Sequence, residues 1–314
     1  MAGRYLEAMR RGIIEERAVQ GWEMLAACTL CPRNCRVDRL ADQRGFCRIG
    51  RLAEIAGYGP HFGEESVLVG TGGSGTIFFC GCNLLCRFCQ NYQISQATDV
   101  DCRPVTADEL AAIMVELQEK GCHNINFVTP THVVPQILAA LPKAIEAGLH
   151  IPLIYNCGGY EDVESLRLLD GIIDIYMPDV KFSDRASASQ YADVADYPEI
   201  MRAALGEMQR QVGDLRIGDD GLAEGGLLVR HLLMPGGLQE AEAIFSFLAK
   251  EISPNCYVNI MDQYRPCGEF AGQGGAATIG AEMYGQAIKA AQAAGLSRLD
   301  RKDFGALIDR LFFP

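Results

Sequence analysis

Apolar and polar residues follow two different periods along this chain. Short runs such as 172–177 are mostly apolar, whereas longer segments such as 106–120 place apolar residues every three or four positions. The first pattern is typical of strands buried on both faces, and the second of helices that bury one face. The predicted strands are 76–80, 124–129, 152–157, 172–177, 227–233 and 256–261, and the predicted helices are 4–19, 106–120, 133–147, 162–169, 239–251, 280–294 and 303–312.

Strands and helices alternate from residue 76 onward, and this order predicts a fold. Thr106 followed by Glu109 has the spacing of a capping box and marks the start of one helix. Alternating strands and helices predict a parallel sheet covered by helices. The strands are too few to close an eight-stranded barrel, so we expect an α/β fold with a partial (β/α)6 TIM-like barrel. Its catalytic residues should lie at the C-terminal ends of the strands.

Residues 28–60 differ from the rest of the chain, because they are rich in Cys, Arg and Gly and lack a clear period. We name this segment the cysteine module and expect metal to hold it together. The chain then divides into residues 1–65, with an N-terminal helix and the cysteine module, and residues 66–314, with the barrel and the C-terminal helices.

Composition and charge narrow the classes of function. The 314 residues are 49% hydrophobic and 22% charged, which is ordinary for a globular protein, and the net charge is −12. Such an acidic chain argues against a nonspecific nucleic-acid surface. The first residues lack the apolar core of a signal peptide, and no run is apolar for long enough to span a membrane. We therefore expect a cytoplasmic protein without nucleic-acid or membrane partners, whose thirteen cysteines favour metal binding over disulfides.

The most specific pattern is Cys82-x3-Cys86-x2-Cys89, with the aromatic Phe88 just before the last cysteine. Cubane iron–sulfur clusters usually take four thiolates. Three thiolates leave one iron open, and an open coordination position lets a metal centre act on a bound molecule. The alternatives are a zinc knuckle with Cys80 as a further ligand, and a disulfide framework. However, Cys80 lies inside an apolar strand, and disulfides need an oxidising compartment.

This motif resembles that of the radical S-adenosylmethionine (radical SAM) superfamily, C-x3-C-x-aromatic-C. The resemblance implies that Cys82, Cys86 and Cys89 ligate a [4Fe-4S] cluster whose open iron chelates S-adenosylmethionine. It also implies that the reduced cluster cleaves this cofactor to a 5′-deoxyadenosyl radical.

Two sequences at strand ends indicate a particular branch of this superfamily. They are N-F-V-T-P-T-H at 126–132 and M-P-D-V-K-F at 177–182. They resemble the PflX-type branch of the pyruvate formate-lyase activating enzyme group. The resemblance implies that Phe88 flanks the adenine, and that Thr129 and Thr131 stand where many relatives bind the methionyl ammonium. The full set of residues implied to bind the cofactor is Phe88, Thr129, Thr131, Asn156, Asp179, Lys181 and Arg230.

Several of these residues also have a plainer interpretation. Asp179 and Lys181 resemble the D-x-K element of activating enzymes, but the same two residues would also suit a buried structural ion pair. Arg230 has the same two interpretations. His132 and His231, which lie near strand ends, are either site residues or ordinary buried histidines.

The cysteine module carries a second set, Cys28-x2-Cys31-x3-Cys35-x11-Cys47. Four cysteines match one full ligand set for either a Zn²⁺ ion or a [4Fe-4S] cluster. An auxiliary cluster would relay electrons or bind substrate, whereas zinc would only hold the module together, and we favour the cluster. The remaining cysteines suit small buried side chains, with Cys157 and Cys267 also placed to offer a thiol to the site: Cys102, Cys122, Cys157, Cys256 and Cys267.

We therefore predict an oxidoreductase-type radical SAM enzyme that abstracts hydrogen from a substrate. By analogy with activases, the leading substrate is a protein that receives a glycyl radical, and the runner-up is a small molecule or peptide. A third interpretation is an iron–sulfur protein for electron transfer or sensing. The enzyme needs an electron donor such as flavodoxin or ferredoxin. The arginines of the cysteine module either bind this donor or are simply solvated: Arg33, Arg36, Arg39, Arg44, Arg48 and Arg51.

Overall fold

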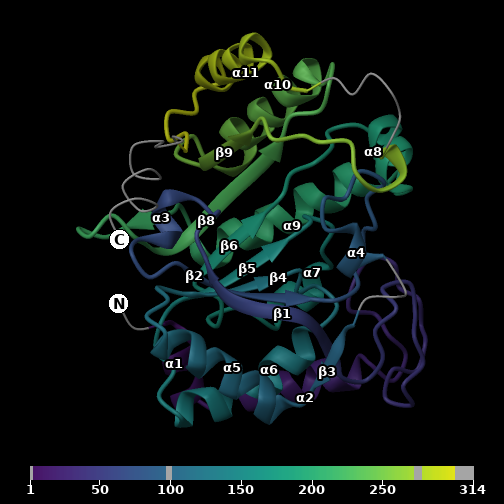
Figure 1. The fold of residues 1–314 in the computed structure, drawn as a ribbon, viewed down its shortest axis with the longest axis vertical. Helices are drawn as coiled ribbons and strands as arrows, with labels where there is room; N and C mark the ends of the chain where they lie inside the picture. Colours follow the sequence, from purple (N-terminus) through teal and green to yellow (C-terminus); the bar gives the residue numbers. More distant parts are fainter. Residues whose placement is uncertain (1–2, 97–100, 272–277, 301–314) are drawn as a thin grey trace.

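A curved sheet of parallel strands forms the centre of the molecule (Figure 1). The computed structural model describes residues 3–96, 101–271 and 278–300. Each neighbouring pair of the central strands is parallel, in the order β2-β4-β5-β6-β8-β9. The predicted partial barrel is therefore confirmed. The strands are β2 (Ser74–Phe79), β4 (Ile125–Val128), β5 (Leu153–Cys157), β6 (Ile175–Pro178), β8 (Ala223–Leu232) and β9 (Tyr257–Met261).

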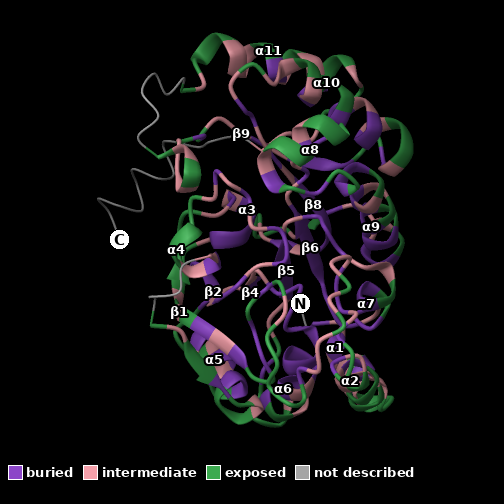
Figure 2. Ribbon diagram, turned by 90° about the vertical axis from the view of Figure 1, so that its right-hand side faces the viewer, coloured by how far each residue is buried: buried purple, intermediate pink, exposed green. Residues whose placement is uncertain are grey.

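Helices cover the outer face of this sheet, and Figure 2 shows buried strands behind partly exposed helices. The predicted capping box is present at α5, where the Thr106 hydroxyl accepts from the Glu109 amide and the Glu109 carboxylate accepts from the Thr106 amide. The covering helices are α5 (Ala107–Glu119), α6 (Val134–Glu146), α7 (Val163–Arg167), α8 (Arg185–Ala192), α9 (Tyr197–Val212), α10 (Leu238–Phe247) and α11 (Ala281–Ala293). A π-helical turn at Leu248–Ile252 extends α10.

The N-terminal helix predicted at 4–19 is in fact two helices, α1 (Tyr5–Arg10) and α2 (Ile13–Glu23). Gly12 separates them because its φ of +68° is left-handed and cannot continue a right-handed helix. Helix α2 packs on α6 at the bottom of the view in Figure 1. The helix predicted at 303–312 lies outside the described residues. No helix in the described part of the chain combines the length and apolar character needed to cross a bilayer.

Two antiparallel strands extend the sheet at one edge. Strand β1 (Ala53–His61) pairs with β2, and β3 (Arg103–Val105) pairs with β1. At the other edge the short β7 (Arg216–Ile217) pairs with β8. Strand β1 comes from the predicted first region of the chain but belongs to the sheet of the second, so the two regions share this sheet.

A short helix, α3 (Ser66–Val69), fills the inside of the curved sheet. Its Val67 and Leu68 pack against side chains that β5, β6 and β8 point inward, such as Ile154, Ile175 and Leu228. Helix α3 occupies one end of the space inside the sheet. The segment just before it, which includes Glu64, therefore forms the floor of the cavity that remains.

Candidate active site

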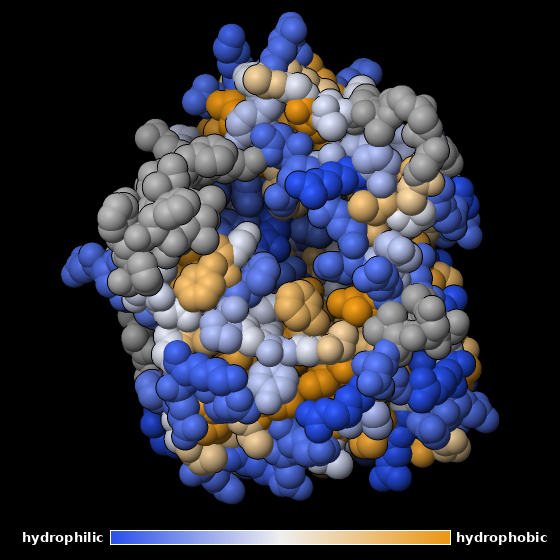
Figure 3. All heavy atoms as spheres, in the orientation of Figure 1, coloured by the Kyte–Doolittle hydropathy of each residue, from blue (hydrophilic) through white to orange (hydrophobic). Residues whose placement is uncertain are grey.

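A cavity of about 380 Å³ lies inside the curved sheet. Its lining residues come from the loop after β2, from the ends of β4 to β9 and from the segment before α3. Figure 3 shows a hollow on this face of the molecule, with hydrophilic side chains around it. The cavity therefore lies where a parallel barrel places its catalytic residues.

The three motif cysteines lie together on the cavity wall. The Cys82 thiol accepts a hydrogen bond from the Leu84 amide at 3.3 Å, and the Cys89 thiol lies 3.4 Å from the Ser95 hydroxyl. Burial raises the pKa of the Cys86 thiol, and the neighbouring Cys82 and Cys89 add to this increase. Burial therefore favours the protonated form of Cys86, although the cation of Lys181 opposes this effect, and a bound metal would stabilise the thiolate.

Asp179 and Lys181 form an ion pair beside these cysteines, with Nζ 2.5 Å from Oδ2, and both line the cavity. Burial opposes the charge of Lys181. Nevertheless, the Asp179 carboxylate holds the pKa of Lys181 above its ordinary value, and an ionised Cys86 would add to this effect. Lys181 is thus a permanent cation next to the motif cysteines, whose sulfurs would be negatively charged thiolates when they bind a metal.

Arg230 also lines the cavity, but two carboxylates already bind its guanidinium. Glu65 makes two hydrogen bonds to it, at 2.6 and 2.7 Å, and Glu64 makes another. The Asn259 amide donates to the same Glu65 carboxylate at 2.6 Å. Burial disfavours the charge of Glu64, but Arg230 and His61 overcome it and lower the pKa of Glu64 to about 2. The floor of the cavity is therefore a pre-formed network of two carboxylates, one guanidinium and the His61 ring.

The other residues predicted to bind the cofactor are divided between the cavity and the interior. Phe88, Thr129 and Asn156 line the cavity, and Phe88 packs edge-to-face against Phe182. Among the described residues, those that line the cavity do not include Thr131.

Thr131 instead donates to a carboxylate that sequence reasoning missed. Glu161 is buried and accepts hydrogen bonds from the hydroxyls of Thr131, at 2.8 Å, and Tyr155, at 2.9 Å. Burial raises the pKa of Glu161 to about 7, although these donors oppose the increase. In the sequence, Glu161 comes shortly after the predicted strand at 152–157. This position near a strand end is the only sequence signal that could have predicted a role for Glu161 near the site.

The two histidines near strand ends are buried, and neither is among the described residues that line the cavity. The His132 ring bonds the Cys80 carbonyl at 2.8 Å, and the His231 ring bonds the Val180 carbonyl at 2.7 Å. Burial lowers the pKa of each to about 4. Both are therefore neutral near pH 7, and the second ring nitrogen of each is buried without a hydrogen-bond partner.

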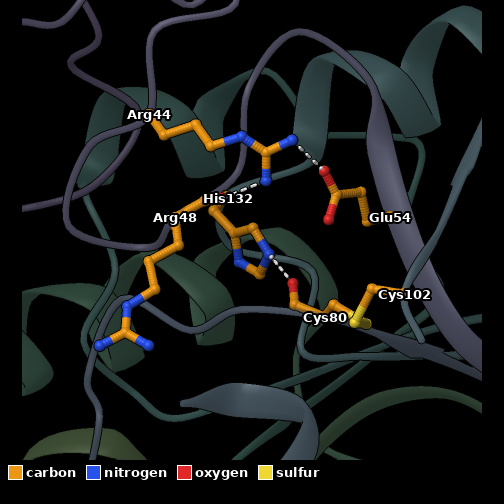
Figure 4. The surroundings of a disulfide bond; sticks show 6 residues. All are labelled: Arg44, Arg48, Glu54, Cys80, Cys102 and His132. Carbon is orange, nitrogen blue, oxygen red and sulfur yellow. Dashed lines mark hydrogen bonds and ion pairs between the residues drawn. A yellow bond between two sulfur atoms is a disulfide. The ribbon is translucent and has the colours of Figure 1, made fainter. Parts of the chain in front are cut away.

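Cys80 and Cys102 form a disulfide beside the motif loop (Figure 4). The expectation that Cys102 is a small buried thiol was therefore wrong, because its sulfur is bonded to Cys80. The same bond removes Cys80 as a further metal ligand in the zinc-knuckle alternative.

The four cysteines of the module lie near one another in the structure. Cys28, Cys31 and Cys47 are buried and Cys35 is half-buried. Burial raises the pKa of the Cys47 thiol, and Arg39 opposes this effect. Among the described residues, no group of three or more His, Cys, Asp or Glu side chains is arranged to hold a metal ion. The second metal site thus stays a prediction.

Arg39 lies fully buried beside these cysteines. Its Nη1 donates to the His132 carbonyl at 2.7 Å and lies 4.0 Å from the Cys28 sulfur, and its Nε donates to the Gly50 carbonyl at 2.9 Å. Its Nη2 has no hydrogen-bond partner. A buried guanidinium is costly without an anion nearby, and the thiols of the module are the groups closest to supplying one.

Comparisons with known proteins give one family match and several similar proteins. The family model described as "Radical SAM superfamily" matches residues 76–205. The chain is 34% identical over 269 residues to "Uncharacterized protein MJ0674" of Methanocaldococcus jannaschii, covering 83% of this chain and 72% of the relative. It is 26% identical over 175 residues to "Uncharacterized protein MJ0808" of the same organism, covering 49% of each. Among solved structures, QueE from Escherichia coli aligns with a TM-score of 0.44 and 10% identity, covering 84% of this chain and 97% of QueE.

Residues 76–205, which carry the motif cysteines, place this chain in the radical SAM superfamily. Members of this superfamily are enzymes that typically bind a [4Fe-4S] cluster and S-adenosylmethionine and generally need a reductant. The site fits such a cluster, because three cavity-lining thiols lie beside the cation of Lys181. A cubane cluster also gives each thiolate its own iron, so its cysteines need not converge on a single ion.

Proposed function

We propose that this enzyme cleaves S-adenosylmethionine reductively and removes hydrogen from a substrate bound in the same cavity. When bound, the cluster and S-adenosylmethionine together supply a 5′-deoxyadenosyl radical that takes the hydrogen. The observation that carries the proposal is the meeting of Cys82, Cys86 and Cys89 with the Asp179–Lys181 pair on one cavity wall.

Individual residues of the cavity have distinct proposed roles. The three motif cysteines hold the cluster, and Lys181 offers a cation to the methionyl carboxylate. Thr129 and Asn156 offer polar atoms to the ammonium and the ribose, and Phe88 offers a flat apolar face to the adenine. Thr131 is already bonded to Glu161, so of the two threonines Thr129 better suits this role.

Arg230 has a different proposed role from the one its sequence position suggested. It already binds Glu64 and Glu65, so its attraction for a further carboxylate is weak. We propose that it holds the floor of the cavity in shape, and that its guanidinium edge faces substrate.

The substrate we propose first is a protein, as for an activase that installs a glycyl radical. The strand-end sequences at 126–132 and 177–182 support this PflX-type, activating-enzyme-like assignment. The cysteine module before the motif argues against a simple activase, and a small molecule or peptide is the second candidate. The third is an iron–sulfur carrier or sensor, which would not cleave S-adenosylmethionine at all.

We also propose that the cysteine module binds a metal centre. The orphaned Nη2 of buried Arg39 supports it, because four thiolates around Zn²⁺ or a [4Fe-4S] cluster carry net negative charge. We favour the cluster, since the module contacts the motif loop and could pass electrons to it.

Anaerobic reconstitution tests the main proposal. The protein is loaded with iron and sulfide, given S-adenosylmethionine and dithionite, and assayed for 5′-deoxyadenosine. We expect product from the wild type and from Cys256→Ala, a buried cysteine outside the cavity. We expect none from Cys86→Ala, because that change removes one ligand of the cluster.

Two results would contradict the proposal. Wild-type protein that binds about four irons but neither binds nor cleaves S-adenosylmethionine would favour the carrier. Equal activity in Cys86→Ala and Cys256→Ala would show that the motif thiols do not support the reaction.

A further inference from the structure

We propose that the exposed face of the cysteine module formed by Arg44, Phe46 and Arg48 is the docking surface for a small acidic electron-carrier protein. We call these three residues the module face. The inference rests on the proposed function, since a carrier is needed only if the cluster must be reduced. It goes further by assigning the place where the carrier binds.

Charge distinguishes the cysteine module from the rest of the molecule. Residues 28–60 contain six arginines, of which Arg39 is buried, against three acidic residues, whereas the whole chain has a net charge of −12. A basic area on an acidic protein attracts an acidic partner, while the remaining surface repels it. Approach of such a partner is therefore directed to this one region.

The module face is continuous. The Arg44 guanidinium donates to the Arg48 carbonyl at 3.0 Å and pairs with Glu54 at 2.8 Å, as Figure 4 shows. The Arg33 guanidinium lies 3.7 Å from the centre of the Phe46 ring and supports it from beneath. Phe46 is nevertheless 38% exposed. An exposed aromatic ring with arginines around it has the composition of a protein interface, where Phe and Arg are enriched.

Direct contacts join this face to the motif loop. The same Arg33 that supports Phe46 donates to the carbonyls of Asn83, at 2.9 Å, and Leu84, at 3.3 Å. These two residues lie between the motif cysteines Cys82 and Cys86. One layer of side chains thus separates the exposed ring from the loop that would hold the cluster.

A second chain of hydrogen bonds connects the module face to the motif loop and starts at Arg48. Its guanidinium donates to the Gln96 carbonyl, and the Gln96 side chain donates to the Cys86 carbonyl at 2.8 Å. Two short paths therefore lead from the module face to the motif cysteines. In the proposed step, the reduced carrier loses one electron and the oxidised cluster gains it, so no further reactant is needed.

The test compares two reductants on the same enzyme. A reduced flavodoxin, kept reduced by its reductase and NADPH, is the protein donor, and dithionite is the small donor that needs no docking surface. The readout is the ratio of the flavodoxin-driven to the dithionite-driven rate of 5′-deoxyadenosine formation. We expect the double variant Arg44→Glu/Arg48→Glu to lower this ratio by roughly tenfold, as is common when charges that steer association are reversed. Arg11→Glu, which reverses an exposed arginine between α1 and α2, should leave it unchanged.

Each other result has a defined meaning. An unchanged ratio in the double variant overturns the proposal, even if both rates fall because the loop is disturbed. An unchanged ratio together with a changed oligomeric state would assign the face to a second copy of the chain. Absence of product with dithionite in the wild type would refute the proposed function instead. In that case, flavodoxin binding measured by fluorescence anisotropy still tests the module face, and equal binding by wild type and double variant would overturn it.

Discussion

At the scale of single residues, the fold changes the chemistry of Glu161 by placing it away from water. Its carboxylate is buried between the hydroxyls of Thr131 and Tyr155. Hydroxyl donors stabilise the charged form, but burial disfavours it more, so the pKa rises to about 7. The folded protein therefore holds this proton more tightly than the unfolded chain does.

This shift predicts how stability depends on pH. A raised pKa in the folded state gives a contribution that is complete below the ordinary pKa of about 4.5 and is lost as pH rises through 7. We expect Glu161→Gln, which cannot ionise, to lack this loss. Between pH 4.5 and 8, the wild type should lose roughly 3 kcal/mol of unfolding free energy relative to the variant, as measured by urea denaturation at a series of pH values.

The control is Glu164→Gln, an exposed carboxylate on α7. Its unfolding free energy should follow the wild type over the same range. Asp174, whose pKa burial also raises, to about 6, is present in all three proteins, so it cancels in the differences. Parallel pH profiles for wild type and Glu161→Gln would show that the pKa of Glu161 is the same in the folded and unfolded states, which would contradict the prediction.

The distance along the chain between interacting residues decides which site residues can be predicted from the sequence. The motif cysteines and the Asp179–Lys181 pair are local patterns, and the structure places all of them on the cavity. Glu65 could not be predicted, because its partner Arg230 lies 165 residues away in the chain. A carboxylate gains such a role only when the fold closes, and no local pattern announces it.

At the scale of elements, burial on both faces is what made the parallel strands predictable. Strand β5 is buried at every position, so its sequence is a continuous apolar run with few exceptions. Strand β1 was missed because Gly57, Gly59 and Pro60 interrupt any apolar pattern. Its pairing with β2 holds it in place, and that pairing is a tertiary feature.

The turn between β2 and the motif loop predicts a sensitive position. Gly81 has a φ of +75°, and a Cβ there would collide with the Cys47 carbonyl of the cysteine module. We expect Gly81→Ala to push the module away from the loop and to lower the unfolding free energy. Gly121→Ala is a matched control, because its φ of +87° is also left-handed but its Cβ meets nothing within 4 Å.

The two variants separate backbone strain from the collision. Gly121→Ala should cost about 1 kcal/mol through φ alone, and Gly81→Ala should cost roughly 2 kcal/mol more through overpacking. Urea denaturation measures both, and iron content after reconstitution should fall only in Gly81→Ala. Equal losses of unfolding free energy and equal iron content in the two variants would mean that the cysteine module does not pack against this turn.

At the scale of the whole molecule, Arg39 connects the cysteine module to the barrel. Its guanidinium bonds the His132 carbonyl, and His132 in turn bonds the Cys80 carbonyl just before the motif. The buried charge of Arg39 is best balanced if the module thiols are ionised around a metal centre. Metal in the module would then stabilise the motif loop without contacting it.

This coupling predicts the effect of Cys28→Ser, which alters the thiol 4.0 Å from Arg39 and leaves the motif intact. If the module binds an iron–sulfur cluster, reconstituted wild type should hold about eight irons per chain and the variant about four. If it binds zinc, one Zn²⁺ should be lost instead. In either case amide hydrogen exchange should become faster in the loop at 82–89, because Arg39 then lacks its anion and the module loosens.

The control is Cys122→Ser, which alters a buried cysteine between α5 and β4 and should change neither the metal content nor the exchange rate. Equal metal content and equal exchange in both variants would mean that Arg39 is balanced without metal and that the module stands on packing alone.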